Sequence, residues 1–210
     1  MKLAGKIRAA NSDVMNFLVM HRRRVRGLTD NLADLIPAGG RVLDIGCGDG
    51  QISWCVQQRR PDVEVVGIDV FARAKCSIQM ETFDGTTIPY GDGAFATAML
   101  VDVLHHTTDP MQLLREACRV AGEAVVIKDH LCEGPAAFKV LKFMDWIGNA
   151  PHGVRLTYNF WSSSQWHDAF DQLGLTVEEQ RKSLKLYPWW ADQLFGRSYH
   201  FVARLGKGHD

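Results

Sequence analysis

The fold of this chain is decided by the stretch Arg41-Val42-Leu43-Asp44-Ile45-Gly46-Cys47-Gly48-Asp49-Gly50. Its apolar first half predicts a short strand buried on both faces, and residues 51–60 have the apolar spacing of a helix. The three glycines between them permit positive φ angles and let a ligand approach the backbone closely. A strand, a glycine loop and a helix N-terminus in this order present backbone N–H groups to an anionic or polar ligand. The stretch therefore predicts the first strand–helix unit of a nucleotide-binding sheet.

The spacing of the glycines separates two kinds of nucleotide-binding protein. The dinucleotide fingerprint is G-x-G-x-x-G, whereas this loop is G-x-G-x-G and has Gln51 where the third glycine should stand. With its acidic residue inside the strand, residues 42–50 resemble the first motif of the class I S-adenosylmethionine-dependent methyltransferases, of the type 11-like kind. A tight strand-to-helix turn of some other α/β protein is the alternative. The resemblance implies cofactor-binding roles for Asp44, Gly46, Cys47 and Gly48.

Composition places the chain among ordinary soluble proteins. It has 210 residues, 46 % hydrophobic and 23 % charged, so one domain spanning residues 1–210 is expected. Lys and Arg number 24, as do Asp and Glu, and this balance gives no general attraction to nucleic acid or to anionic membrane. The five scattered cysteines form no C-x-x-C pair, so neither disulfides nor a metal site is expected. The absence of a signal pattern and of any apolar run near 20 residues predicts a cytoplasmic protein.

A second candidate cofactor residue ends the next strand. The apolar residues 63–68 lead into Asp69, which follows Gly46 at close to the separation of about 20 residues expected when strand, helix and strand intervene. A carboxylate at the end of the second parallel strand can accept hydrogen bonds from both ribose hydroxyls. It suits NAD and S-adenosylmethionine equally. We therefore predict that Asp69 and the neighbouring Val70 bind the cofactor.

The resemblance continues after residue 82. The segment F-D-G-T-T-I-P-Y at residues 83–90 is similar to the family segment that crosses the adenine of the cofactor. The resemblance implies that Asp84 accepts a hydrogen bond from the adenine amino group, and that Gly85 and Val101 belong to the same site. One departure is Ala96, where the family often has an acid, and we interpret that position as structural.

Three histidines are candidate bases. Ligands of an open parallel sheet bind outside the carboxyl ends of its strands, so the residues after the fourth strand (96–103) and the fifth strand (124–127) should meet the glycine loop. Imidazole groups titrate near neutral pH. His130 is the first catalytic candidate and His105 the second, while His106 is a candidate for acceptor binding. A structural role in hydrogen bonding or packing is the alternative for each.

Residues 131–161 are the candidate acceptor-side lid. They are rich in aromatic and aliphatic side chains at partly helical spacing. This composition suggests an apolar or ring-bearing acceptor, with Met144, Tyr158 and Trp161 as candidate contacts. The alternative is that the same side chains pack the lid onto the sheet.

Residues 1–37 are predicted to form an N-terminal helical cap. Gly27 and the following Thr29-Asp30 should divide it into two helices. The basic run His21–Arg26 is the strongest charge cluster, and it is either a solvated helix face or a weak contact of Arg22–Arg26 with an anionic or lipid-like partner. Nucleic acid is not favoured, because one short run in a neutral protein is a small electrostatic footprint.

Together these patterns predict an α/β fold: a doubly wound, seven-stranded, mostly parallel sheet of the Rossmann-like methyltransferase type, with N-terminal helices and a helical, aromatic lid after the fifth strand. Residues 38–130 would be the cofactor-binding core. Residues 162–210 would complete the sheet, with a helix that begins at a capping box of Ser162 and Gln165, a sixth strand over 175–180 and an antiparallel seventh strand over 198–205.

The resemblance implies methyl transfer from S-adenosylmethionine to a small molecule, leaving S-adenosylhomocysteine, with O- or C-methylation favoured. The protein's main task is then alignment, and a base is needed only where the acceptor must lose a proton. Two other classes stay open: an NAD-dependent oxidoreductase, disfavoured by Gln51, and a non-catalytic S-adenosylmethionine-binding protein. A monomer and a homodimer are both compatible with the sequence.

Overall fold

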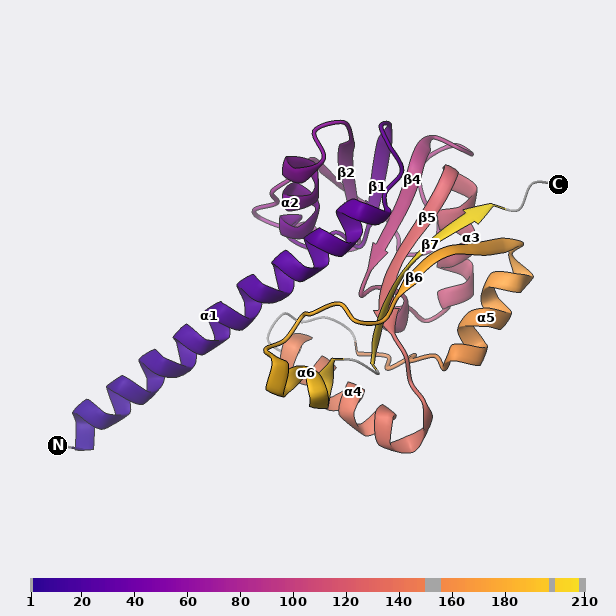
Figure 1. Ribbon diagram of the computed structural model, residues 1–210. Helices are drawn as coiled ribbons and strands as arrows, with labels where there is room; N and C mark the ends of the chain where they lie inside the picture. The colour runs from indigo at the N-terminus through magenta and orange to yellow at the C-terminus, as the bar shows by residue number, and fades with distance from the viewer. Residues whose placement is uncertain (1, 150–155, 197–198, 208–210) are drawn as a thin grey trace.

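The computed structural model describes residues 2–149, 156–196 and 199–207 (Figure 1). Its centre is a seven-stranded sheet in the order β3-β2-β1-β4-β5-β7-β6. The strands are β1 (Arg41–Ile45), β2 (Glu64–Asp69), β3 (Met80–Thr82), β4 (Phe95–Val101), β5 (Ala121–His130), β6 (Leu175–Arg181) and β7 (His200–Lys207). Strands β1 to β5 pair in parallel, whereas β7 pairs antiparallel with both β5 and β6. The predicted mostly parallel sheet with its antiparallel seventh strand is confirmed.

Helices cover both faces of this sheet. They are α1 (Lys2–Leu35), α2 (Gln51–Arg59), α3 (Pro110–Val120), α4 (Gly134–Asn149), α5 (Ser163–Gln172) and α6 (Trp189–Phe195), with a 3-10 helix η1 (Leu104–His106). Apolar residues of α1 and α2 pack with one set of strand side chains, and those of α3 and α5 pack with the other set. The two cores arise because alternate strand residues point to opposite faces. Within the described residues, no helix has the length and apolar character needed to cross a membrane.

Local side-chain and glycine signals mark the ends of two of these helices. The Asp109 side chain accepts a hydrogen bond from the backbone N–H of Gln112 and begins α3. Ser162 and Gln165 form the reciprocal capping box that begins α5. Gly174, with φ +62, follows that helix and turns the chain into β6.

The N-terminal helices are one helix rather than two, which corrects the sequence prediction. Gly27 lies inside α1, and a Cβ there would lie 3.1 Å from the Leu184 carbonyl oxygen and 3.2 Å from Leu186 Cδ2. Glycine therefore serves close packing at this point. A helix tolerates it at a cost of about 1 kcal/mol, which tertiary contacts offset. In Figure 1 the N-terminal half of α1 extends away from the sheet.

Helix α4 forms the helical part of the lid predicted after the fifth strand. Helix α4 lies below the carboxyl end of the parallel strands in Figure 1. Its buried side carries Leu141 and Asp145, but Phe143, Trp146 and Ile147 are each more than half exposed. These three side chains therefore do not pack against the sheet, and the acceptor-side role of the lid stays a prediction. The sequence Asn-Ala-Pro-His-Gly at 149–153 predicts an end to this helix, and residues 150–153 lie outside the described residues.

Candidate functional site

The glycine loop joins β1 to α2 and borders open space. Its backbone N–H groups at Gly46 and Cys47 donate to the carbonyl oxygen of Ile68, at 2.7 and 3.1 Å. Gly46 has φ +76, and a Cβ there would lie 2.6 Å from Val103 Cγ2, so the loop packs directly on the segment after β4. Gly48 has φ +60, and a Cβ there would meet nothing within 4 Å. The loop is thus anchored on one side and approachable on the other.

Asp44 supplies a buried acceptor under this loop. The hydroxyl of Ser53 donates to its Oδ2 at 2.5 Å, while Oδ1 is buried and has no hydrogen-bond partner in the described part of the chain. Burial, opposed by the Ser53 hydrogen bond and reinforced by the charge of Asp69, raises the pKa of Asp44 to about 7. Buried polar atoms are nearly always paired, so this oxygen fits a donor supplied by a ligand.

Asp69 ties the loop to the end of β2. Its Oδ2 accepts from the Gly48 N–H and its Oδ1 from the Phe71 N–H, both at 2.9 Å. A carboxylate oxygen has two lone pairs, so each one retains capacity for a ribose hydroxyl. A Cβ on Gly85 would lie 2.9 Å from Val70 Cγ1, which places Gly85 beside Val70 at the same edge. This donor and acceptor set fits an adenosyl ligand.

Asp84 is exposed and shapes its own turn. Its Oδ1 accepts from the backbone N–H groups of Thr86 and Thr87, both at 2.7 Å, and these bonds lower its pKa. The preceding Phe83 N–H donates to the Asp69 carbonyl, which brings the segment to the end of β2. Its contact with adenine stays a prediction, as do the cofactor roles of Cys47 and of Val101 at the end of β4.

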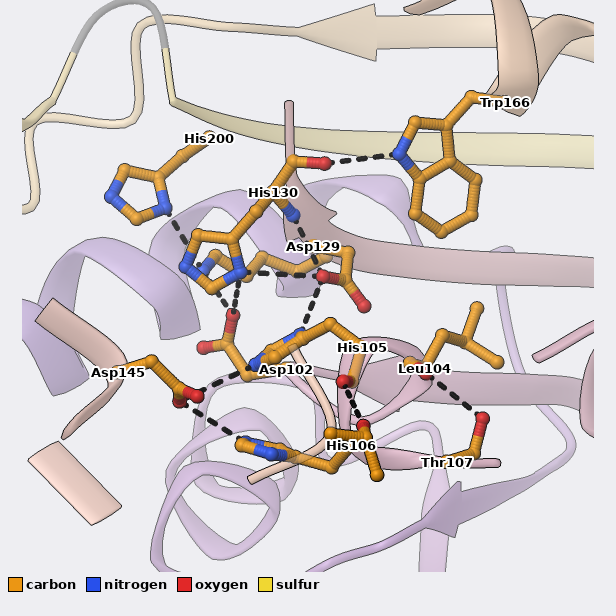
Figure 2. Close-up of polar contacts among 12 residues, drawn as sticks. Asp102, Leu104, His105, His106, Thr107, Asp129, His130, Asp145, Trp166 and His200 are labelled. Carbon is orange, nitrogen blue, oxygen red and sulfur yellow. Dashed lines mark hydrogen bonds and ion pairs between the residues drawn. The ribbon is translucent and has the colours of Figure 1, made fainter. Parts of the chain in front are cut away.

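Three histidines and two aspartates meet at the ends of β4 and β5 (Figure 2). Asp129 Oδ1 accepts from His105 Nδ1 at 2.7 Å and from the His130 backbone N–H at 2.8 Å, with His130 Nδ1 at 3.3 Å. Asp145 of α4 faces the other two imidazoles, with its Oδ1 3.4 Å from His106 Nε2 and 3.7 Å from His105 Nε2. The structure therefore brings together all three histidines predicted from the sequence.

The histidines differ in charge because their neighbours differ. Burial alone would lower the pKa of His105, but the Asp129 carboxylate raises it to about 9. Burial and the positive charge of Lys128 lower the pKa of His130 to about 4, and burial together with His105 lowers that of His106. At neutral pH the site thus holds one imidazolium, at His105, and two neutral imidazoles.

A second ionic group lies next to His130. Asp102 accepts from Arg24 Nη2 at 2.5 Å and from Lys128 Nζ. Burial alone would raise the pKa of Asp102, but Lys128 and Arg24 hold it well below its usual value. Lys128 Nζ also lies 3.2 Å from His200 Nδ1. The basic run of α1 is therefore divided: Arg24 enters this site, whereas its neighbours line a groove.

That groove lies between α1 and the segment after β6. Its volume is about 700 Å³, and it is lined by the arginines of α1 on either side of Arg24 together with Arg181 and Lys185. Asp30 and Asp34 line it as well, so its charge is mixed. The predicted weak surface contact through Arg22–Arg26 stays a prediction.

The candidate acceptor residues of the lid are dispersed. Tyr158 has its ring 6.2 Å from that of Phe160, which in turn stacks on His105 at 5.3 Å with the planes 26° apart. Trp161 packs edge to face on Trp166 at 4.8 Å, so its ring contributes to the hydrophobic core. Met144 is half-buried on α4. An acceptor role for each stays a prediction, and Tyr158 is linked to His105 through the ring of Phe160.

Metal-ligating side chains also gather here. One group comprises Asp102, His105, Asp129 and His130, and another comprises His105, His106 and Asp145. In the first group, Lys128 already lies on Asp102 and the His105 imidazolium on Asp129, so the carboxylates are neutralised by the protein itself.

Sequence reasoning missed three residues of the site, Lys128, Asp145 and His200, and it named Arg24 only as part of the basic run. Two of these residues left a trace in the sequence. Lys128 directly follows an apolar strand, and Asp145 is the only acid among residues 134–149. Such isolated charges in apolar segments are seldom buried without a partner, so they point to an internal pair.

The fold and the glycine loop together define a nucleotide-binding, doubly wound protein. A family model described as a methyltransferase domain matches residues 20–180. The chain belongs to this family, the class I S-adenosylmethionine-dependent methyltransferase domains. S-adenosylmethionine is the cofactor of the family, and the cofactor-binding roles of Asp44, Gly48 and Asp69 stay predictions.

Relatives cover parts of the chain. It is 33 % identical over 108 residues to the 27-O-demethylrifamycin SV methyltransferase of Amycolatopsis mediterranei, a match that covers 44 % of this chain and 39 % of that protein. It is 35 % identical over 118 residues to the phosphoethanolamine N-methyltransferase of Triticum aestivum. That match covers 50 % of this chain and 23 % of the wheat protein. The chain thus spans less than two fifths of the length of these relatives.

A solved structure shows the same fold. The magnesium protoporphyrin IX methyltransferase of Synechocystis, determined with bound SAH, superposes with a TM-score of 0.59 at 16 % identity. The superposition covers 90 % of this chain and 84 % of that one.

Proposed function

We propose that this protein transfers a methyl group from S-adenosylmethionine to an oxygen or carbon atom of a small, apolar or ring-bearing molecule. The observation that carries the proposal is the neutral His130, held by Asp129 at the carboxyl edge of the sheet. The glycine loop touches Val103, only two residues before His105 of the same cluster. A methyl donor on that loop and a base at His130 would therefore share one site.

The tautomer of His130 suits a proton acceptor. Asp129 is ionised, because His105 and His130 lower its pKa against the effect of burial, and an ionised carboxylate only accepts hydrogen bonds. His130 Nδ1 therefore carries the ring proton, and Nε2 keeps a lone pair. Bound S-adenosylmethionine supplies a methyl group already activated by its sulfonium. The acceptor hydroxyl becomes strongly acidic as its new bond forms, so a weak base such as His130 suffices.

Aromatic rings beside the histidines support a ring-bearing acceptor. Phe160 stacks on His105 and lies 5.6 Å from the ring of His130. Phe138 of α4 meets Phe160 edge to face at 6.1 Å. Phe160 is buried and Phe138 is 39 % exposed, so Phe138 is the ring of this pair that offers apolar surface, as in other small-molecule sites.

The test is a His130→Asn variant assayed with a panel of phenols and other hydroxylated ring compounds. Product formation should fall by about 10²- to 10⁴-fold, the usual contribution of a general base. Calorimetric affinity for S-adenosylmethionine should stay unchanged. His167→Asn, at an exposed histidine of α5, is the matched control.

Two results would contradict the proposal. Wild-type turnover in the His130 variant would remove this residue from the chemistry. Binding of S-adenosylmethionine without any methylated product across the panel would favour a non-catalytic binding protein.

A further inference from the structure

The outward face of α4 is an exposed apolar surface. Phe143, Trp146 and Ile147 are 54 %, 56 % and 54 % exposed. They stand at positions i, i+3 and i+4, so they share one face of the helix. The solvent face of a surface helix is normally polar. Single exposed apolar residues need no explanation, but a contiguous apolar group on one face calls for one.

The charges on this face have one sign. Lys139 and Lys142 are exposed, and Lys142 Nζ lies 4.9 Å from the centre of the Tyr158 ring. The single acid of the helix, Asp145, is buried on the opposite side against the histidines. Trp189 of α6 is 79 % exposed, and α6 lies below the sheet with α4 in Figure 1. The exposed face of α4 therefore combines apolar and aromatic side chains with the positive charge of Lys139 and Lys142.

We propose that the outward face of α4 docks on the surface of an anionic phospholipid bilayer. Tryptophan rings favour the headgroup level, apolar neighbours insert below it, and lysines meet anionic lipids. A second copy of the chain fits less well. A two-fold dimer through this face would set Lys139 and Lys142 near the same residues of its partner, and like charges repel. The balanced net charge of the chain does not oppose docking, because this attraction is local.

Docking would orient the candidate site toward the lipid. Asp145, which contacts His105 and His106, lies on the inner side of the helix whose outer side meets the bilayer. The inference does not depend on which molecule is methylated, and it can be tested without any acceptor.

The experiment is co-sedimentation of the full chain with vesicles of phosphatidylcholine alone or mixed with phosphatidylglycerol. The wild type should bind the mixed vesicles, with a blue shift of tryptophan fluorescence, and bind phosphatidylcholine weakly. Lys139→Glu with Lys142→Glu should weaken partitioning by at least roughly 30-fold, from the contribution of two lysines near an anionic surface. Phe143→Ser with Trp146→Ser should abolish the fluorescence shift.

Matched controls use exposed residues elsewhere. Trp54→Ser removes a tryptophan of α2 that is 47 % exposed, and Lys182→Glu with Lys207→Glu reverses two exposed lysines on other elements. These control variants should bind vesicles like the wild type.

The proposal is overturned if the wild type binds neither kind of vesicle, or if the control variants and the α4 variants lose binding equally. A dimer in light scattering that the α4 substitutions dissociate would assign the face to a second copy. Calorimetry with S-adenosylmethionine tests the proposed function separately.

Discussion

Replacing Asp129 with asparagine should make the stability of the protein much less dependent on alkaline pH. In the folded state the Asp129 carboxylate, working against burial, raises the pKa of His105 from 6.5 to about 9. The protonated pair therefore contributes stability that is fully present below pH 6.5 and is lost as pH rises through 9. At 1.36 kcal/mol per pKa unit, that contribution is about 3 kcal/mol.

The variant should be less stable than the wild type at pH 7. Breaking a buried pair by removing one partner costs about 3–5 kcal/mol. The wild type should lose most of its pair-dependent stability between pH 7 and pH 10, whereas the variant has little of it to lose. The two unfolding free energies should therefore converge as pH rises.

Urea denaturation followed by tryptophan fluorescence measures both proteins at several pH values. His167→Gln, which removes an exposed histidine paired with Asp171, serves as the control and should follow the wild type. Parallel pH profiles for the wild type and Asp129→Asn would refute the reasoning. They would mean that His105 is neutral in the folded protein.

Two further predictions concern the cofactor and the fold. Asp69→Asn should weaken binding of S-adenosylmethionine by about 10- to 100-fold, because hydrogen bonds to a charged group contribute about 1.5–3 kcal/mol; unchanged calorimetric affinity would remove Asp69 from the cofactor site. Ser162→Ala should lower the free energy of unfolding by about 1 kcal/mol through loss of the capping box that begins α5. Thermal denaturation measures this second effect, and an unchanged midpoint would show that the cap contributes nothing.

Much of the fold follows from short-range rules. The spacing of Leu113, Leu114, Ala117 and Val120 gives α3 one apolar face, and all four are buried. The strands of the parallel sheet were found because buried strands have continuous apolar runs. The prediction at Gly27 failed because the close approach of Leu184 and Leu186 to α1 comes from residues more than 150 positions away.

The sequence by itself determined the sheet, the glycine loop, the helix caps and the class of cofactor, because each depends on side chains a few residues apart. Only the tertiary structure decided how the site is charged. The hydrogen bond from Arg24 to Asp102 spans 78 residues, and that from His105 to Asp129 spans 24. Which of three histidines is protonated depends on burial and on these distant partners, and both exist only once the strands and α4 have come together.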